Sequence, residues 1–312
     1  MEYKRLGKSG LQVSAVGLGC NNFGMRIDKD QTKAVVDKAI EVGITLFDTA
    51  NIYGGTRSEE FLGEALGNRR RDIVLATKFA GPVGGGSLNH GGSRRHVIQA
   101  CEESLRRLNT DWIDLYQLHF PDPLTPIEET LRALDDLIRA GKVRYIGNSN
   151  MSGWQVVEAE WTARSHNLSP FVSAQNEYNL LDRRIEKELT PACQQYGLGI
   201  LPYFPLASGL LTGKYHRGEA PAADTRIAAW GTRGERMLSD KNFDVVEKLE
   251  AFAKDRGKTL LDLAFSWLAS HDYIPSVIAG ATKPEQAAAN AAAAEWKLTP
   301  EEMTEVDTIT AR

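Results

Sequence analysis

The chain has 312 residues, of which 42% are hydrophobic and 25% are charged, and its formal net charge is -4. These values are typical of a globular protein, and the length suits one α/β barrel as well as two smaller domains. The negative charge argues against nucleic acid or an anionic membrane as a partner, because both require a basic surface. No run of about 18 apolar residues occurs, so no membrane span is expected.

The first ten residues lack the apolar segment of a secretory signal. The three cysteines (Cys20, Cys101 and Cys193) are far apart and form no zinc or redox motif, and the six histidines show no metal-binding pattern. We therefore expect a cytoplasmic protein with reduced thiols and no bound metal.

Apolar runs alternate with amphipathic segments along the chain. A hairpin is expected over residues 1–13, where apolar and charged residues flank Lys8-Ser9-Gly10. Eight later runs are rich in β-forming residues and mostly lack strict alternation, which is typical of strands buried on both faces of a parallel sheet. They cover residues 14–19, 44–47, 73–77, 112–118, 143–147, 171–175, 198–203 and 276–280.

Helix signals separate the strands. Thr125 and Glu128 form the pattern of a capping box, and the helix that follows should end before Gly141. Thr299 and Glu302 repeat the pattern near the C-terminus. Repeated strand–helix units are right-handed crossovers, and eight of them favour a closed (β/α)8 TIM barrel over an open doubly wound sheet. We expect one barrel domain over residues 1–312, with a short N-terminal β-hairpin.

Two segments interrupt this alternation and predict long loops at the C-terminal face of the barrel. Residues 81–93 are rich in glycine, which suits a mobile substrate loop or a plain surface loop equally well. Residues 209–238 are too long for an ordinary connection after a strand. We interpret this second segment as a lid over a phosphate-bearing ligand, with a simple insertion as the alternative.

Four residues with proton-transfer chemistry follow expected strands: Asp48, Tyr53, Lys78 and His119. A tyrosine has an ordinary pKa of about 10, and a buried lysine beside it favours the phenolate and lowers that pKa. An aspartate would hold the lysine charged, and a histidine would orient a substrate oxygen. Each residue alone is more often structural, but barrel enzymes place their chemistry at these strand ends. Together the four predict a proton donor to a carbonyl group.

Eight stretches, in order along nearly the whole chain, resemble the aldo-keto reductase superfamily. They are GLGCNNFG (17–24), FDTANIYG (47–54), LATKF (75–79), LYQLHFPD (115–122), GKVRYIGNSN (141–150), AQNEYNLL (174–181), YFPLASGLLTGKY (203–215) and VIAGATKPEQAAAN (277–290). The resemblance implies an NADP(H)-dependent barrel enzyme that reduces aldehydes or ketones to alcohols, with NAD as a possible cofactor. In agreement, no glycine fingerprint of a Rossmann fold is present.

The resemblance also implies roles for individual residues. Tyr53 would donate the proton, Lys78 would lower its pKa, Asp48 would pair with Lys78, and His119 would position the carbonyl. Ser149, Asn150 and Gln175 would bind the nicotinamide carboxamide, Tyr203 would stack on the ring, and Cys20, Asn21 and Asp48 would also contact the cofactor. The pyrophosphate would lie along Pro205, Leu206, Ser208, Gly209 and Leu210, with Lys214 and Arg226 as cations. The adenosine end would contact Gly280, Thr282, Lys283, Gln286 and Asn290.

Some positions depart from the family pattern. Phe204 stands where many relatives have serine, and Ala289 stands where a glutamate is common. Thr282 occupies a position beside the 2′-phosphate that is often serine, arginine or lysine, and the adjacent Lys283 would supply the positive charge there. NADPH is therefore favoured, with NAD left open.

The substrate is expected to be a small-molecule carbonyl compound bound among apolar side chains (Phe23, Phe79, Phe120 and Trp230), although aromatic residues at such positions also serve as core packing. Two other functions remain open. One is an aldose dehydrogenase that uses the same chemistry oxidatively. The other is a cofactor-sensing regulator similar to the potassium-channel β subunits, although no obligate protein partner is predicted.

Overall fold

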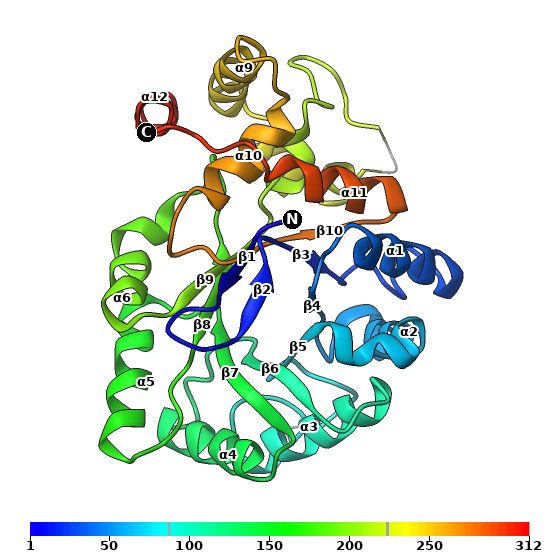
Figure 1. Cartoon of the computed structure of the whole chain (residues 1–312), viewed down its shortest axis with the longest axis vertical. Coiled ribbons are helices and arrows are strands. Elements are labelled where there is room, and N and C mark those ends of the chain that lie inside the picture. Colours follow the sequence, from blue (N-terminus) through cyan, green and yellow to red (C-terminus); the bar gives the residue numbers. More distant parts are fainter. Residues whose placement is uncertain (87, 223–224, 312) are drawn as a thin grey trace.

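The structure, a computed structural model, describes residues 1–86, 88–222 and 225–311, without the side chains of residues 226, 229 and 233. Eight parallel strands are ordered β10-β3-β4-β5-β6-β7-β8-β9, and β9 lies next to β10, so the sheet closes into a barrel inside a ring of helices (Figure 1). The strands are β3 (Val16–Gly19), β4 (Leu46–Asp48), β5 (Val74–Phe79), β6 (Ile113–Leu118), β7 (Val143–Ser149), β8 (Ser173–Glu177), β9 (Gly199–Tyr203) and β10 (Val277–Gly280). The predicted (β/α)8 barrel is confirmed.

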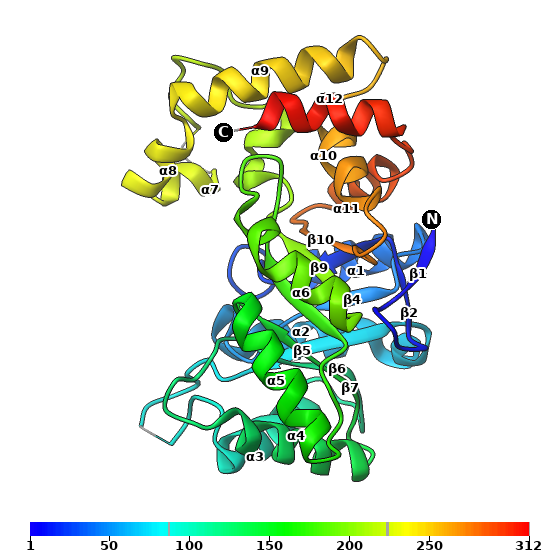
Figure 2. The same cartoon turned by 90° about the vertical axis from the view of Figure 1, so that its left-hand side faces the viewer.

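The surrounding helices are α1 (Lys29–Glu41), α2 (Arg57–Leu66), α3 (Arg94–Arg107), α4 (Ile127–Arg139), α5 (Gly153–Ser165), α6 (Leu189–Tyr196), α10 (Leu260–Ala269) and α11 (Pro284–Ala293). Two short helices, α7 (Arg226–Ala229) and α8 (Thr232–Met237), lie in the long segment after β9. Helices α9 (Asp240–Lys254) and α12 (Pro300–Thr310) pack side by side beyond α10 (Figure 2). Among the described helices, none is both long and apolar enough to cross a bilayer.

One of the two predicted helix caps is present. Thr299 and Glu302 form the capping box of α12. The predicted box at Thr125 is wrong, because α4 starts at Ile127 after Pro126 and has no side-chain cap. The Thr125 hydroxyl instead donates to Asp122 Oδ2 at 2.7 Å. Thr125 therefore bonds to a neighbour in the loop after β6 and does not cap the helix.

The N-terminal hairpin closes one end of the barrel. Its strands, β1 (Tyr3–Arg5) and β2 (Gln12–Ser14), pair antiparallel, as predicted. The hairpin side chains Leu6 and Val13 are fully buried and share a cluster with residues of five barrel strands: Leu46, Ala76, Leu115, Leu201 and Ile278. Burying an aliphatic side chain stabilises a fold by about 1.5–3 kcal/mol. The hairpin therefore gives the barrel a dry, apolar floor.

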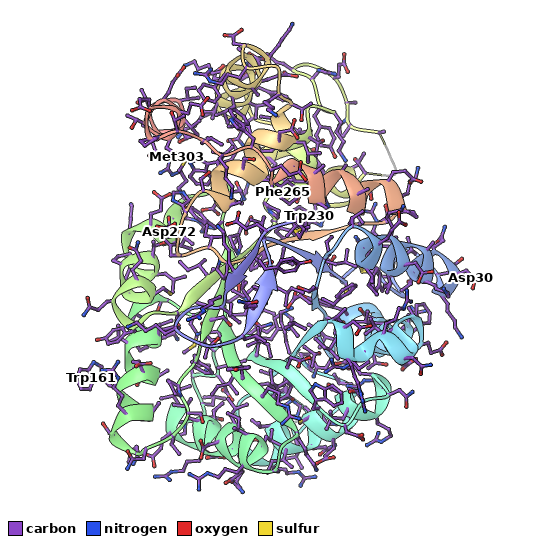
Figure 3. All side chains as sticks on the ribbon, in the orientation of Figure 1. Asp30, Trp161, Trp230, Phe265, Asp272 and Met303 are labelled. Atoms are coloured by element: carbon purple, nitrogen blue, oxygen red, sulfur yellow. The ribbon has the colours of Figure 1, made fainter. Side chains whose placement is uncertain are left out.

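A polar layer lies above this floor in the same strands. Side chains alternate in direction along a strand, so the residue two positions further on returns to the same face. Leu46 in the floor is thus followed by Asp48, Ala76 by Lys78 and Leu115 by Gln117, and these three polar side chains are buried. The larger apolar core fills the space between strands and helices, while the exposed Trp161 of α5 points outward (Figure 3). The period of two thus brings charged and amide groups together at the C-terminal end of the barrel.

Candidate active site

Lys78 stands at the centre of the polar layer. Its side chain is fully buried, and its Nζ donates to Asp48 Oδ2 at 2.6 Å and to the carbonyl oxygen of Thr49 at 2.9 Å. The same nitrogen lies 3.3 Å from Tyr53 Oη. Three of the four residues predicted for proton transfer are therefore in direct contact. Asp48 comes from β4, Lys78 from β5 and Tyr53 from the loop after β4.

A tight turn aims the Tyr53 side chain. Tyr53 opens the 3-10 segment η1 (Tyr53–Thr56), in which Gly54 and Gly55 have φ angles of +59° and +66°. A Cβ atom on Gly54 would lie only 2.5 Å from the carbonyl oxygen of Phe23. Only glycine fits both the left-handed backbone and this close approach. The turn therefore fixes where the chain leaves the strand end and where the phenol ring points.

The pKa directions of this pair follow from burial and charge. Burial alone would lower the pKa of Lys78, but Asp48 and Tyr53 outweigh it, so that pKa is raised and the amine is protonated. For Tyr53, burial raises the pKa more than Lys78 lowers it, so the net direction is upward. The predicted net lowering of the Tyr53 pKa is therefore wrong. The phenol is a protonated donor, and Lys78 limits how weak an acid it becomes.

His119 follows β6 and completes the group. Its ring contacts that of Tyr53 edge-on, with 5.7 Å between centroids, and stacks on Phe120 at 4.2 Å. Burial, and secondarily the charge of Lys78, lowers the pKa of His119 to about 2. Its Nδ1 is buried and has no hydrogen-bond partner among the described residues. The ring is thus neutral at physiological pH, and the tautomer protonated on Nε2 offers a donor rather than a charge.

The residues predicted for the carboxamide lie next to His119. Asn150, whose φ is +59°, donates from Nδ2 to the His119 carbonyl oxygen at 2.9 Å and accepts from Tyr203 Oη at 2.8 Å. Ser149 Oγ donates to the backbone oxygen of Gln175 at 2.8 Å. A cavity of about 380 Å³ is lined by Asn150 and Tyr203 but by none of the four proton-transfer residues. The ends of β7, β8 and β9 are thereby tied to the proton-donor group.

The loop predicted for the pyrophosphate has an unusual backbone. In η4 (Ala207–Thr212), Ala207, Ser208 and Gly209 have consecutive positive φ angles of +43°, +58° and +99°. Ser208 Oγ is buried without a partner among the described residues, and a Cβ on Gly209 would lie 2.8 Å from Lys214 Nζ. The backbone nitrogens of Ala207 and Gly209 donate to the carbonyl oxygens of Phe204 and Leu206, so hydrogen bonds within the turn hold this backbone. The Ser208 hydroxyl and the neighbouring Lys214 ammonium fit a phosphate group. Pro205, Leu206 and Leu210 belong to the same stretch.

The residues predicted for the adenosine end surround the start of α11. Gln286 Oε1 accepts from the backbone nitrogen of Thr282 at 2.8 Å and from its hydroxyl at 3.1 Å. Lys283 is exposed directly before the helix, Asn290 is buried within it, and Gly280 is exposed at the end of β10. A helix N-terminus carries a partial positive charge and binds phosphate well. Asn21 lies close to Gly280, because a Cβ there would be 3.2 Å from Asn21 Oδ1.

Several predicted contact residues lie elsewhere. Cys20, Phe23 and Phe79 are fully buried in the core, so in this structure they present no surface to a ligand. Phe120 is 43% exposed beside His119, and Trp230 is partly exposed with its ring edge-on to Phe204. The side chain of Arg226 lies outside the described residues.

Within the described chain, no group of three or more His, Cys, Asp or Glu residues could hold a metal ion.

Both predicted loops are anchored to their surroundings. In the glycine-rich loop, the Gly92 backbone nitrogen donates to Asp122 Oδ2 at 2.8 Å. In the longer segment, Arg217 reaches α9 and forms ion pairs with three acidic side chains there: Asp240 at 2.9 Å, Asp244 at 2.7 Å and Glu247 at 3.0 Å. The sequence did not indicate these ion pairs, because the partners of Arg217 follow more than 20 residues later.

Gln117 was missed in the sequence. It is fully buried at the end of β6, and its Nε2 donates to Asp48 Oδ1 at 3.0 Å. A sequence signal did exist: Gln117 lies two residues before His119 and two after Leu115, so it shares the inward face of its strand with them. A polar residue at an inward position next to a catalytic candidate was the clue.

Comparisons with known proteins identify the family of the chain. The model of the Aldo/keto reductase family matches residues 15–311. A probable voltage-gated potassium channel subunit beta of Oryza sativa subsp. japonica is 39% identical over 319 aligned residues, which cover 99% of this chain and 96% of the relative. A putative voltage-gated potassium channel subunit beta of Schizosaccharomyces pombe is 37% identical, with 98% and 92% covered. YrpG, an uncharacterized oxidoreductase of Bacillus subtilis, is 36% identical, with 92% and 89% covered. The chain belongs to the aldo/keto reductase family.

Proposed function

We propose that the protein is an NADP(H)-dependent reductase that converts aldehydes or ketones to alcohols. Family membership supports an oxidoreductase. The observation that carries the proposal is the position of Lys78 Nζ, 2.6 Å from Asp48 Oδ2 and 3.3 Å from Tyr53 Oη. A buried ammonium in this position has little structural value, because an apolar side chain would fill the same space without a desolvation penalty. It does suit a phenol that must give up a proton.

The residues divide the work of carbonyl reduction. A bound dinucleotide would supply the hydride to the carbonyl carbon. Tyr53 donates its phenolic proton to the carbonyl oxygen, and Lys78 stabilises the phenolate that remains. Asp48 holds the ammonium in place. Neutral His119 donates a hydrogen bond to the same oxygen, which orients the carbonyl and stabilises the charge that develops on it.

Three features support a phosphorylated dinucleotide as the cofactor. Gln175 donates to Asp48, and Ser149 donates to the backbone oxygen of Gln175, which suits the nicotinamide carboxamide. The buried hydroxyl of Ser208 and the adjacent Lys214 suit the pyrophosphate. Lys283, at the start of α11, suits a 2′-phosphate and thus favours NADPH over NADH.

A second candidate function is a cofactor-sensing regulator, because two of the relatives reported above are named as potassium channel β subunits. An aldose dehydrogenase is the oxidative counterpart of the main proposal. The complete set of Asp48, Tyr53, Lys78 and His119 supports turnover over sensing alone.

The test is a panel of aldehydes, ketones and sugars with NADPH and with NADH, followed through the absorbance of the reduced nicotinamide and run in both directions. The proposal predicts faster reduction of aldehydes or ketones with NADPH. Cofactor binding without turnover of any substrate would favour the regulator, and faster oxidation of sugars would favour the dehydrogenase.

A further inference from the structure

A triangle of buried side chains connects the proton-donor group to the predicted carboxamide site. Asp48 Oδ2 is taken by Lys78, while Oδ1 accepts from Gln117 Nε2 at 3.0 Å and from Gln175 Nε2 at 2.9 Å. Gln175 Nε2 also lies 3.5 Å from Gln117 Oε1. Gln117 and Gln175 are 0% and 2% exposed, so both amides depend on these partners.

The carboxylate dictates how the two amides are turned. An ionised carboxylate can only accept hydrogen bonds, so each glutamine must present its NH₂ group to Asp48. The two N–H groups of Gln175 are then directed at Asp48 Oδ1 and Gln117 Oε1. Its Oε1 accepts no hydrogen bond from any described residue and is not among the buried unpaired atoms, so it faces accessible space. A flipped amide would place an oxygen against the carboxylate, which is repulsive.

We propose that Gln117 is a positioning residue. Its Oε1, together with the shared partner Asp48, holds the Gln175 amide with its oxygen turned outward, ready to accept a hydrogen bond from the N–H of a nicotinamide carboxamide. The inference rests on the proposed use of a nicotinamide cofactor. It assigns Asp48 a second task besides pairing with Lys78. Asp48, which holds Lys78 beside the proton donor, would then also determine that Gln175 offers an acceptor to the cofactor.

The wild-type protein offers the first test. The acetylpyridine analogue of NADP⁺ keeps the ring carbonyl but has a methyl group in place of the amide NH₂. A fixed acceptor at Gln175 predicts that NADP⁺ binds about tenfold more tightly than this analogue, because the analogue leaves the acceptor unpaired. Quenching of intrinsic tryptophan fluorescence measures both dissociation constants without any turnover. Equal affinities would overturn the fixed orientation.

The second test uses Gln117→Met, which keeps the length of the side chain and removes both its donor and its acceptor. We expect the preference for NADP⁺ over the analogue to fall to about threefold or less, because a Gln175 amide held only by Asp48 is less constrained. Gln99→Met is the matched control, since Gln99 is exposed on α3, and it should keep the full preference. A full preference in Gln117→Met would also overturn the proposal.

Each outcome has one meaning. Wild-type protein that binds no NADP⁺ and reduces no carbonyl compound would refute the proposed function itself. Binding and turnover together with an unchanged preference in Gln117→Met would refute only the role of Gln117. If Gln117→Met does not fold, as judged by circular dichroism, the comparison of NADP⁺ with its analogue on wild-type protein still decides whether the amide is fixed.

Discussion

The hydroxyl oxygen of Tyr53 lies 3.3 Å from the ammonium nitrogen of Lys78, inside a barrel whose floor is apolar. The low dielectric of the barrel interior affects the pKa of Tyr53 in two opposite ways. It raises the pKa of the phenol through burial, and it strengthens the effect of Lys78, which lowers that pKa. Because burial dominates, Tyr53 stays protonated at neutral pH. Lys78 acts mainly on the phenolate that proton transfer would leave behind.

Lys283 is predicted to select the phosphorylated cofactor. Lys283→Ala removes an exposed cation at the N-terminus of α11. We expect about tenfold weaker binding of NADPH and less than about twofold change for NADH, because only NADPH carries the 2′-phosphate. Dissociation constants from fluorescence titration check this, with the exposed Lys33→Ala on α1 as the control. Equal losses for both cofactors would remove Lys283 from the phosphate site.

Arg217 is predicted to hold the segment after β9 in place. Arg217→Met breaks its three ion pairs with α9 while keeping much of the aliphatic stem. If residues 209–238 cover the cofactor, stopped-flow measurement should show NADPH release faster by about threefold or more. Arg132→Met, which breaks an exposed ion pair with Glu128 on α4, is the control. An unchanged release rate would argue that the segment is not a lid.

His271 is predicted to make the fold sensitive to acid. Its ring stacks on Tyr273 and contacts Trp267 edge-on, and burial lowers its pKa to about 4. The unfolded chain binds the proton near pH 6.5 and the folded chain only near pH 4, so stability falls as the pH drops through this window. Denaturant titrations should show that His271→Gln reduces the slope there by up to about 1.4 kcal/mol per pH unit.

The control for this experiment is His216→Gln, because His216 is exposed in the segment after β9. That variant should keep the wild-type slope between pH 4 and pH 6.5, the window set by the folded and unfolded values for His271. A wild-type slope in His271→Gln would show that protonation of this ring does not oppose folding.

The strands were predictable because a parallel barrel buries both faces of each strand. All eight predicted runs overlap the observed strands, and errors are confined to the ends. The run predicted over residues 143–147, for example, continues to Ser149 in β7. The extension was hidden because Asn148 and Ser149 are polar, yet both are buried. Polar residues at the end of a strand read as a loop in the sequence, because their buried partners lie in other strands.

The same property limits prediction of the site. Phe23 and Phe79 were predicted to line the substrate pocket, but both are buried in the core. The sequence does not show which face of a buried strand or loop meets the ligand. The role of Gln117 became visible only once its partners Asp48 and Gln175, which lie in other strands, were known. The direction of the Tyr53 pKa depends on how strongly burial competes with one ammonium, which is a property of the assembled barrel. Spacing along the chain cannot supply it.

The most direct measurement of the central claim compares Tyr53→Phe with wild-type protein for turnover of an aldehyde with NADPH and for NADPH binding. The variant loses one hydroxyl, the atom 3.3 Å from Lys78 Nζ, and Tyr3→Phe is the control on the N-terminal hairpin. The account predicts a fall in kcat of about 100-fold or more, with the dissociation constant of NADPH within about threefold of wild type. Wild-type turnover in Tyr53→Phe would contradict it.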